Sequence, residues 1–233
     1  GHQLESRFHM SLTKAQALDL YHSDDLIGIG MEADAVRKRL HPEGVVTYII
    51  DRNINYTNLC TEYCTFCAFY APVKGPGRAN GYVLDFETIY EKIRETVELG
   101  GTGILMQGGL NPDLPLKWYE DLLRGIKQRF PQVHLHCFSA SEIIHFAGLE
   151  GISIRDTIVR LRDAGLDSIP GGGAEILDDE VRYKVARLKC LTADWLNVHR
   201  TAHQLGMRTT ATMMFGCGEE LRHRVNHLQH IFD

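Results

Sequence analysis

Three cysteines at CxxxCxxC spacing constrain this chain more than any other feature. Cys60, Cys64 and Cys67 follow a run of residues that predicts a β-strand, and no fourth cysteine or histidine lies near them in the sequence. A structural zinc site usually has four protein ligands, and an electron-transfer iron–sulfur cluster usually has four cysteines. Three cysteines therefore favour a cubane cluster with one iron open to a substrate or cofactor. The alternatives are a chance group of buried thiols, or zinc with a distant fourth ligand.

Charge and cysteine content restrict the class of protein. The chain has 233 residues, a formal net charge of −5 and no basic run, so we expect neither nucleic acid nor an anionic membrane as a partner. No apolar run is long enough to span a bilayer, and no secretory signal pattern is present. Six cysteines, three of them clustered, favour a metal centre in a reducing compartment over a disulfide framework. We therefore expect a cytoplasmic protein.

The hydrophobic pattern divides the chain into three parts. Residues 1–10 resemble a tag remnant that ends at an initiator Met10, and residues 11–44 predict an N-terminal helical segment. Residues 45–233 predict a core in which strands alternate with loops and helices, the strands being 45–55, 103–107, 133–138, 167–169 and 208–214. This alternation predicts an α/β fold with a parallel sheet, wound as an open sheet or closed into a barrel. Loops that follow such strands gather at one end, which in barrels carries the active site.

Alternation along residues 133–138 separates side chains that face the helices from those that face the interior. Cys137 belongs to the helix-facing set, whereas the expected interior side chains are those of His134, His136 and Phe138. His136 lies nearer the carboxyl end of the strand and is the candidate for proton transfer, with a satisfied core histidine as the alternative. Other histidines form i, i+4 pairs without a zincin context, and we expect them on helix surfaces: His199, His203, His223 and His227.

Glycine-rich and polar loops follow the predicted strands. Gln107, Gly108 and Gly109 end one strand, where a double glycine allows the backbone to approach a ligand closely or simply to turn. Ser139 and Glu142 follow the next strand, and this pair is either a helix-capping arrangement or a contact to a ligand at the mouth of a barrel.

The most unusual loop contains three consecutive glycines. Gly171, Gly172 and Gly173 lose much conformational entropy on ordering, which favours close packing of backbone against a ligand over a solvated turn. Glu175 follows them and is a candidate hydrogen-bond acceptor for a ribose hydroxyl.

With an aromatic residue before its third cysteine, the stretch CTEYCTFC resembles the cluster motif of the radical S-adenosylmethionine (SAM) superfamily. The resemblance implies that Cys60, Cys64 and Cys67 hold a [4Fe-4S] cluster whose open iron chelates SAM, and that Phe66 lies beside the adenine. It also implies that the double glycine meets the amino group of SAM, that an external one-electron reductant is needed, and that the fold is a partial (βα) barrel. The chain shows fewer strand–helix units than such a core usually has and ends directly after a helix, so we expect a C-terminally truncated barrel.

A longer resemblance identifies a family within this superfamily. The segments ILMQGGLNPDLPLKWYEDLLR, HLHCFSASEI and AGLDSIPGGGAEIL resemble cyclic dehypoxanthinyl futalosine synthases of the futalosine route to menaquinone. The resemblance implies that dehypoxanthinyl futalosine is the substrate and that a 5′-deoxyadenosyl radical abstracts a hydrogen atom from its ribose before the ring closes. A base must then accept a proton, and His136 and Glu175 are the candidates. The sequence departs from this family after Phe215, where Cys217 stands in place of a histidine.

Other functions remain open at this stage. The chain also resembles aminofutalosine synthase and the radical SAM subunit of the deazaflavin-cofactor synthase. An alternative of a different class is a non-enzymatic iron–sulfur or zinc binding module.

Overall fold

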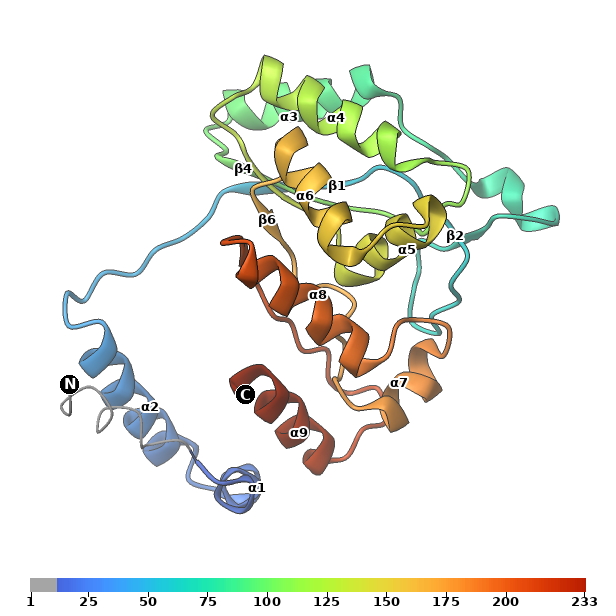
Figure 1. The fold of residues 1–233 in the computed structure, drawn as a ribbon. Coiled ribbons are helices and arrows are strands. Elements are labelled where there is room, and N and C mark those ends of the chain that lie inside the picture. The colour runs from blue at the N-terminus through green and yellow to red at the C-terminus, as the bar shows by residue number, and fades with distance from the viewer. Residues whose placement is uncertain (1–11) are drawn as a thin grey trace. The chain divides into compact units, whose positions relative to one another are not determined.

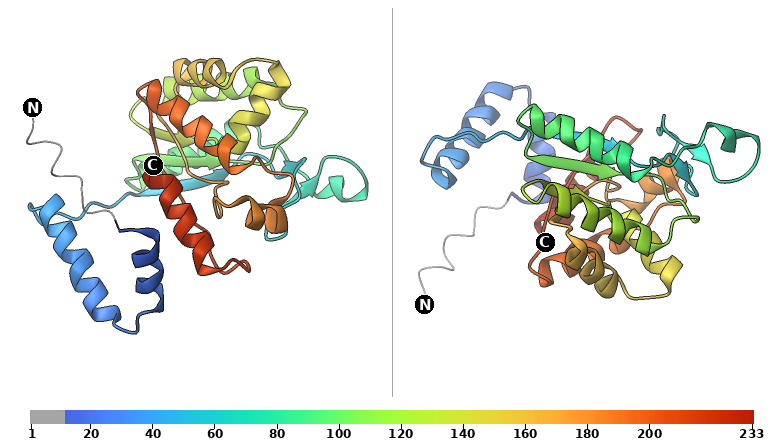
Figure 2. Two further views of the ribbon diagram at one scale, coloured as in Figure 1. Left: turned by 60° about the horizontal axis from the view of Figure 1, so that its bottom comes forward. Right: turned by 90° about the horizontal axis from the view of Figure 1, so that it is seen from above.

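A computed structural model describes residues 12–233, which form two units (Figures 1 and 2). One unit contains the described residues up to Tyr48 together with Gly218–Asp233, and the other contains Ile49–Cys217. The expected tag remnant at residues 1–10 lies outside the described residues. None of the helices in the described part of the chain is long and apolar enough to cross a membrane.

The smaller unit is helical. It contains α1 (Lys14–His22), α2 (Leu26–Leu40) and α9 (Leu221–Phe232), and α1 packs against α9. The Thr13 side chain accepts a hydrogen bond from the Gln16 N–H at 3.2 Å, and the Gln16 side chain accepts one from the Thr13 N–H at 2.9 Å, so a capping box starts α1. Asp25 caps α2 by accepting from the Gly28 N–H at 2.8 Å. Both α1 and α2 lie within residues 11–44, whereas α9 belongs to this unit although the predicted core extended to residue 233.

The larger unit contains one parallel sheet whose strands pair in chain order. The strands are β1 (Asp51–Asn55), β4 (Gly103–Gln107), β5 (His134–Cys137), β6 (Ser168–Ile169) and β7 (Arg208–Thr209). The connecting helices are α3 (Phe86–Glu98), α4 (Leu116–Arg129), α5 (Ala140–Glu150), α6 (Ile154–Ala164), α7 (Asp179–Ala186) and α8 (Thr192–Gln204), as Figure 1 shows. Sequential parallel strands joined through helices are the winding of a (βα) barrel, which confirms the predicted fold class.

Apolar side chains on one face of this sheet pack against the helices. Ile104 and Met106 of β4 and Leu135 and Cys137 of β5 are fully buried, and they share a core with residues of α3, α4, α5, α6 and α8. Because strand side chains alternate, the neighbouring residues face the opposite side of the sheet. There the strand register aligns a largely polar row: Asn53, Leu105, His136 and Ser168. The sheet therefore presents an apolar face to the helices and a polar face to the interior.

Phe138 departs from the predicted alternation. Its φ of 62° lies in the left-handed region, so this residue leaves the extended backbone of β5 and the alternation no longer applies. The ring is fully buried and packs edge-on against Tyr119 of α4 and Phe146 of α5. The prediction that Phe138 faces the interior with His134 and His136 was therefore wrong.

Two predicted strands are longer than the observed ones. Residues 45–50 precede β1 without strand pairing, and the side chains of Val46 and Tyr48 are 84% and 83% exposed. The last predicted strand, 208–214, is reduced to Arg208–Thr209. Apolar and β-branched residues favour extended backbone, but a strand also needs a hydrogen-bonded neighbour along its length.

Shorter elements frame the cysteine loop. β2 (Leu59–Cys60) and β3 (Ala71–Pro72) form a separate parallel pair at its two ends, and a 3₁₀ helix, η2 (Pro76–Asn80), follows. These elements and α7 were not predicted from the sequence.

Three of the four paired histidines are buried. His199 of α8 is 5% exposed and stacks on Trp195 with ring centroids 3.8 Å apart. His223 and His227 of α9 are also buried, whereas His203 is exposed and bonds to the Thr209 hydroxyl. Surface placement was therefore wrong for three of the four. Burial lowers the pKa of His199 to about 4, so the ring is neutral at neutral pH.

Candidate functional site

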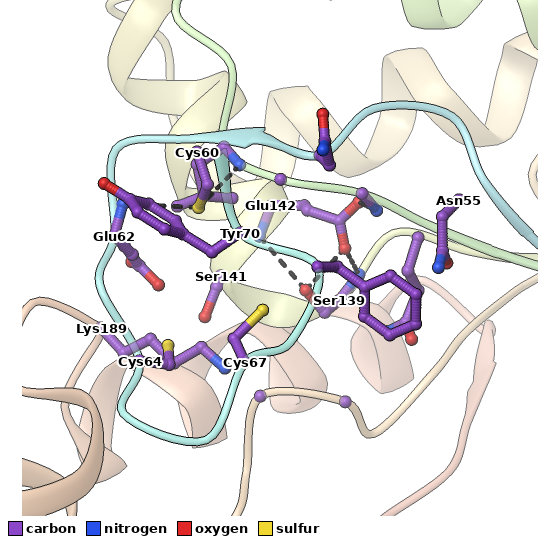
Figure 3. A pocket seen from close by; sticks show the side chains of 18 of the residues that line it. Asn55, Cys60, Glu62, Cys64, Cys67, Tyr70, Ser139, Ser141, Glu142 and Lys189 are labelled. Atoms are coloured by element: carbon purple, nitrogen blue, oxygen red, sulfur yellow. Dashed lines mark hydrogen bonds between the residues drawn. The ribbon is translucent and has the colours of Figure 1, made fainter. Parts of the chain in front are cut away.

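A cavity of about 340 Å³ opens at the carboxyl ends of the strands (Figure 3). Its lining combines the cysteine loop with the loops that follow β4, β5 and β6. Most of the residues selected from the sequence line it: Cys60, Cys64, Phe66, Cys67, Gln107, Gly108, Gly109, Ser139, Glu142, Gly172, Gly173 and Glu175. Two selected residues, His136 and Gly171, are not part of this lining.

Backbone contacts hold the cysteine loop in place. The Thr65 N–H and hydroxyl both donate to the Val185 carbonyl of α7, at 2.9 and 3.1 Å. The Thr61 N–H donates to the Leu110 carbonyl at 3.0 Å, next to the double glycine. The loop is therefore attached both to α7 and to the loop after β4.

The three cysteines of the loop are free thiols. The Cys60 sulfur accepts hydrogen bonds from the N–H groups of Leu110 and Glu62, at 3.3 and 3.4 Å. Burial raises the pKa of Cys60, and it raises the pKa of Cys64 to about 11 although Lys189 opposes the shift. The Cys60 and Cys64 thiols are therefore protonated in metal-free protein at neutral pH, and binding of a metal centre would release their protons.

The donor set of the cavity fits a three-cysteine cluster. Among the described residues that line it, there is no histidine and no cysteine besides Cys60, Cys64 and Cys67. The carboxylates present are those of Glu62, Glu142 and Glu175. Glu142 and Glu175 already bond to protein partners. Burial raises the pKa of the third carboxylate, Glu62, to about 7, although the positive charge of Lys189 opposes the shift.

Glu142 joins three loops through its buried carboxylate. One oxygen accepts from the Tyr56 hydroxyl at 2.6 Å and from the Gly108 N–H at 3.0 Å. The other accepts from the Ser139 N–H and hydroxyl, both at 2.7 Å, in a capping box that starts α5. Burial raises the pKa of Glu142 while these hydrogen bonds oppose the shift. The helix-capping arrangement of Ser139 and Glu142 is thus observed. The Glu142 carboxylate also holds the loop after β4, through the Gly108 N–H.

The double glycine is required by protein packing. A Cβ atom on Gly108 would lie 2.5 Å from the Tyr56 ring, and one on Gly109 would overlap the Leu59 carbonyl. The Gly109 N–H donates to the Thr57 carbonyl at 2.9 Å. The backbone of Gly108 and Gly109 therefore packs closely against the residues that follow β1, and it also lines the cavity.

The triple glycine packs in the same way. A Cβ atom on Gly171 would lie 2.6 Å from the Ala211 Cα atom, and one on Gly172 would overlap the Gln107 side chain. Gly173 has a φ of 80°, where a side chain is strained. The Gly171 N–H also donates to the Thr210 hydroxyl at 2.9 Å. The backbone at Gly171 and Gly172 is therefore closely packed, as predicted, and the neighbouring atoms belong to the protein.

An ion pair lies at the edge of the cavity beside the cysteine loop. The Lys189 ammonium and Glu175 carboxylate are 2.9 Å apart, with side chains only 15% and 13% exposed. The ammonium also lies 5.6 Å from the centroid of the Phe66 ring. Burial alone would lower the pKa of Lys189, but Glu175 and Cys64 outweigh it and the pKa is raised. Lys189 is therefore a cation held within the cavity.

His136 has polar partners away from the cavity lining. Its Nδ1 atom lies 2.7 Å from the Ser168 hydroxyl, and its Nε2 atom lies 3.2 Å from the Thr210 hydroxyl. Burial lowers the pKa of His136, and His134 adds to the shift, so the ring is neutral at neutral pH. Of the two candidate bases, Glu175 alone lines the cavity.

Tyr56 and Lys189 are among the residues of this site that were not predicted from the sequence. Tyr56 and Lys189 contact partners that are 86 and 14 residues away in the sequence, and only the fold brings these groups together. Neither residue stands in a local sequence pattern that indicates its role.

Comparisons with known proteins show the family to which the chain belongs. The family model of the radical SAM superfamily matches residues 54–231. The chain is 47% identical over 222 residues to a cyclic dehypoxanthine futalosine synthase of Halalkalibacterium halodurans, covering 95% of this chain and 59% of that protein. It is 42% identical to an FO synthase of Streptomyces avermitilis, covering 94% of this chain and 25% of that protein. The chain therefore spans well under two thirds of these relatives.

A solved structure shares the fold. The crystal structure of methylornithine synthase matches with a TM-score of 0.72 and covers 96% of this chain and 61% of that one. Sequence identity is 17%, so this likeness concerns the fold alone.

Proposed function

The chain belongs to the radical SAM superfamily, and from that premise we propose that it carries the core of an enzyme that cyclises dehypoxanthinyl futalosine. The observation that carries the proposal is the cavity lined by three cysteines without another cysteine or a histidine among its described lining residues. Identity of 47% to a cyclic dehypoxanthine futalosine synthase supports this choice of substrate.

Three side chains would hold the inorganic cofactor. Cys60, Cys64 and Cys67 would ligate a [4Fe-4S] cluster, which supplies the electron that cleaves SAM to methionine and a 5′-deoxyadenosyl radical. SAM would be consumed as a cosubstrate, and the cluster would need an external one-electron donor.

Other groups in the cavity would bind SAM. The backbone of Gly108 and Gly109 lines the cavity and would accept a hydrogen bond from the SAM ammonium group. Lys189 is a buried cation beside Cys64 and would face the SAM carboxylate. Phe66 is 40% exposed within the same lining, so its ring can pack against the adenine.

The reaction removes two hydrogens from the substrate. The deoxyadenosyl radical takes a hydrogen atom from a ribose carbon, and the carbon radical then adds to the aromatic ring. Loss of one electron to a one-electron acceptor and one proton to a base restores aromaticity. Glu175 is the proposed base because its carboxylate lines the cavity, and its partner Lys189 can compensate the charge change. His136 is the second candidate, with a neutral ring that can accept a proton.

The test is anaerobic incubation of the reconstituted protein with SAM, dithionite and dehypoxanthinyl futalosine. The expected products are 5′-deoxyadenosine and a compound lighter than the substrate by two hydrogen atoms, both detected by mass spectrometry. Deoxyadenosine without a change in the substrate would contradict the proposed substrate while retaining SAM cleavage.

FO synthase chemistry is the second candidate, because the chain is 42% identical to an FO synthase over 94% of its length. Parallel incubation with the FO synthase substrates separates the two. Metal analysis of the same sample addresses the binding-module alternative, since zinc at one per chain without iron would exclude the radical reaction.

A further inference from the structure

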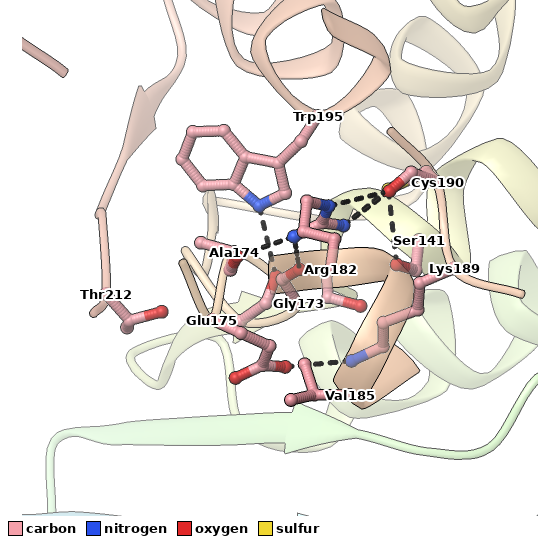
Figure 4. A network of polar contacts seen from close by, with 12 residues as sticks. Ser141, Gly173, Ala174, Glu175, Arg182, Val185, Lys189, Cys190, Trp195 and Thr212 are labelled. Carbon is pink, nitrogen blue, oxygen red and sulfur yellow. Dashed lines mark hydrogen bonds and ion pairs between the residues drawn. The ribbon is translucent and has the colours of Figure 1, made fainter. Parts of the chain in front are cut away.

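Arg182 of α7 has a buried guanidinium that bonds to backbone rather than to a carboxylate. The side chain is 3% exposed and donates to the Gly173 and Ala174 carbonyls at 3.0 and 2.5 Å (Figure 4). It also donates to the Cys190 carbonyl, at 3.0 Å from Nε and a second time from Nη2. The Asp179 carboxylate lies 4.0 Å from Nε and is half exposed. A buried charge is costly unless its hydrogen bonds are satisfied, and here carbonyls satisfy them.

These carbonyls belong to the two loops that carry the ion pair of the cavity. Gly173 and Ala174 directly precede Glu175, and Cys190 directly follows Lys189. Arg182 therefore bonds next to both members of the pair without lining the cavity itself.

The backbone of Glu175 is strained. Its φ of 48° is in the left-handed region, which is unfavourable for a residue with a side chain. Arg182 holds the peptide before it, and the Met214 N–H donates to the Glu175 carbonyl at 2.9 Å on the other side. Such strain persists only where surrounding contacts enforce it, and it is concentrated at functional sites.

We propose that Arg182 is a positioning residue that holds the Glu175 carboxylate and the Lys189 ammonium together beside the cysteine loop. Its hydrogen bonds join the loop that contains Gly173 and Ala174 to the loop after α7, which contains Cys190. The consequence for SAM binding rests on the proposed function, whereas the joining of the two loops does not.

The first measurement needs neither cluster nor substrate. The Trp195 indole N–H donates to the Gly172 carbonyl at 3.3 Å, one residue before a carbonyl that Arg182 holds. In metal-free Arg182→Met, we expect hydrogen exchange of this indole, followed by NMR, to be faster by about tenfold. The Trp118 indole is the internal reference.

The matched control is Arg160→Met. Arg160 of α6 is ion-paired with Glu120 at 2.6 Å and neither residue lines the cavity, so the variant removes a guanidinium elsewhere in the unit. Both variants are compared at temperatures where circular dichroism shows them folded. The control is expected to leave Trp195 exchange unchanged.

The second measurement uses reconstituted protein and the release of deoxyadenosine from SAM. We expect Arg182→Met to raise the KM for SAM by about ten- to a hundredfold with a smaller change in kcat. In Arg182→Ala, added guanidinium ion fills the vacated space and is expected to lower the KM again. Such a rescue would show that hydrogen bonds to these carbonyls, rather than packing of the arginine side chain, determine the KM.

The outcomes separate the two proposals. If folded Arg182→Met matches Arg160→Met in both Trp195 exchange and KM, the positioning role is wrong. If the wild type releases no deoxyadenosine, the proposed function fails, and the exchange result alone decides whether Arg182 joins the loops.

Discussion

Replacing Tyr56 with phenylalanine removes one hydroxyl from the centre of the site and leaves the ring in place. The hydroxyl is buried and donates to the Glu142 carboxylate at 2.6 Å, while the ring packs against Trp118, Tyr119 and Phe138. A hydrogen bond to a charged group contributes about 1.5–3 kcal/mol, and without it this Glu142 oxygen keeps only the Gly108 N–H as a donor within residues 12–233. We expect the free energy of unfolding to fall by about 2 kcal/mol.

Urea denaturation of the metal-free protein measures this loss as a lower midpoint at an unchanged m-value. The control is Tyr119→Phe, because the Tyr119 hydroxyl is buried in the same cluster and makes no hydrogen bond within the described part of the chain. Its removal is expected to be neutral or stabilising. Equal losses in the two variants, or a loss below about 0.5 kcal/mol for Tyr56→Phe, would refute the role assigned to the Glu142 contact.

Three further outcomes are expected. Gly108→Ala places a methyl group against the Tyr56 ring and should destabilise by about 1–3 kcal/mol in urea denaturation, whereas Gly148→Ala, where space is open on α5, should stabilise slightly. Because folding lowers the pKa of His199, the folded state loses stability as pH falls from 6.5 towards 4, by about 3 kcal/mol in the free energy of unfolding. His199→Phe should not show this loss when its urea unfolding is measured across the same pH range. An equal loss in the variant would show that other groups cause it. Cys64→Ala should abolish iron incorporation and deoxyadenosine release, and deoxyadenosine from that variant would contradict the proposed ligand set.

Local signals in the sequence were sufficient for most of the sheet. The strand at 103–107 was predicted with its observed bounds, because an apolar run is enclosed by glycines on both sides. The strand predicted at 45–55 was too long, since strand propensity is local whereas pairing depends on a distant neighbour. Helix α7 was missed because its buried face contains Arg182, and a charge interrupts the apolar pattern that would have indicated a helix.

The candidate site was predictable where spacing or composition is unusual. Cysteines at CxxxCxxC spacing and a triple glycine stand out in any sequence, and the structure brings both to one cavity. Lys189 could not be recognised in this way, because a lysine near the end of a helix is ordinarily a surface residue. Its burial follows from Glu175 on another loop.

The backbone makes the three thiol groups of the cysteine loop chemically unequal. Among the described residues, two amide donors converge on the Cys60 sulfur, from Leu110 and Glu62, and Cys64 and Cys67 have no such pair. Amide donors withdraw electron density from a thiolate, so the sulfur of Cys60 should be the least covalent of the three toward a bound metal. Selenium K-edge absorption of reconstituted protein with selenocysteine at one of the three positions at a time would measure this difference in covalency.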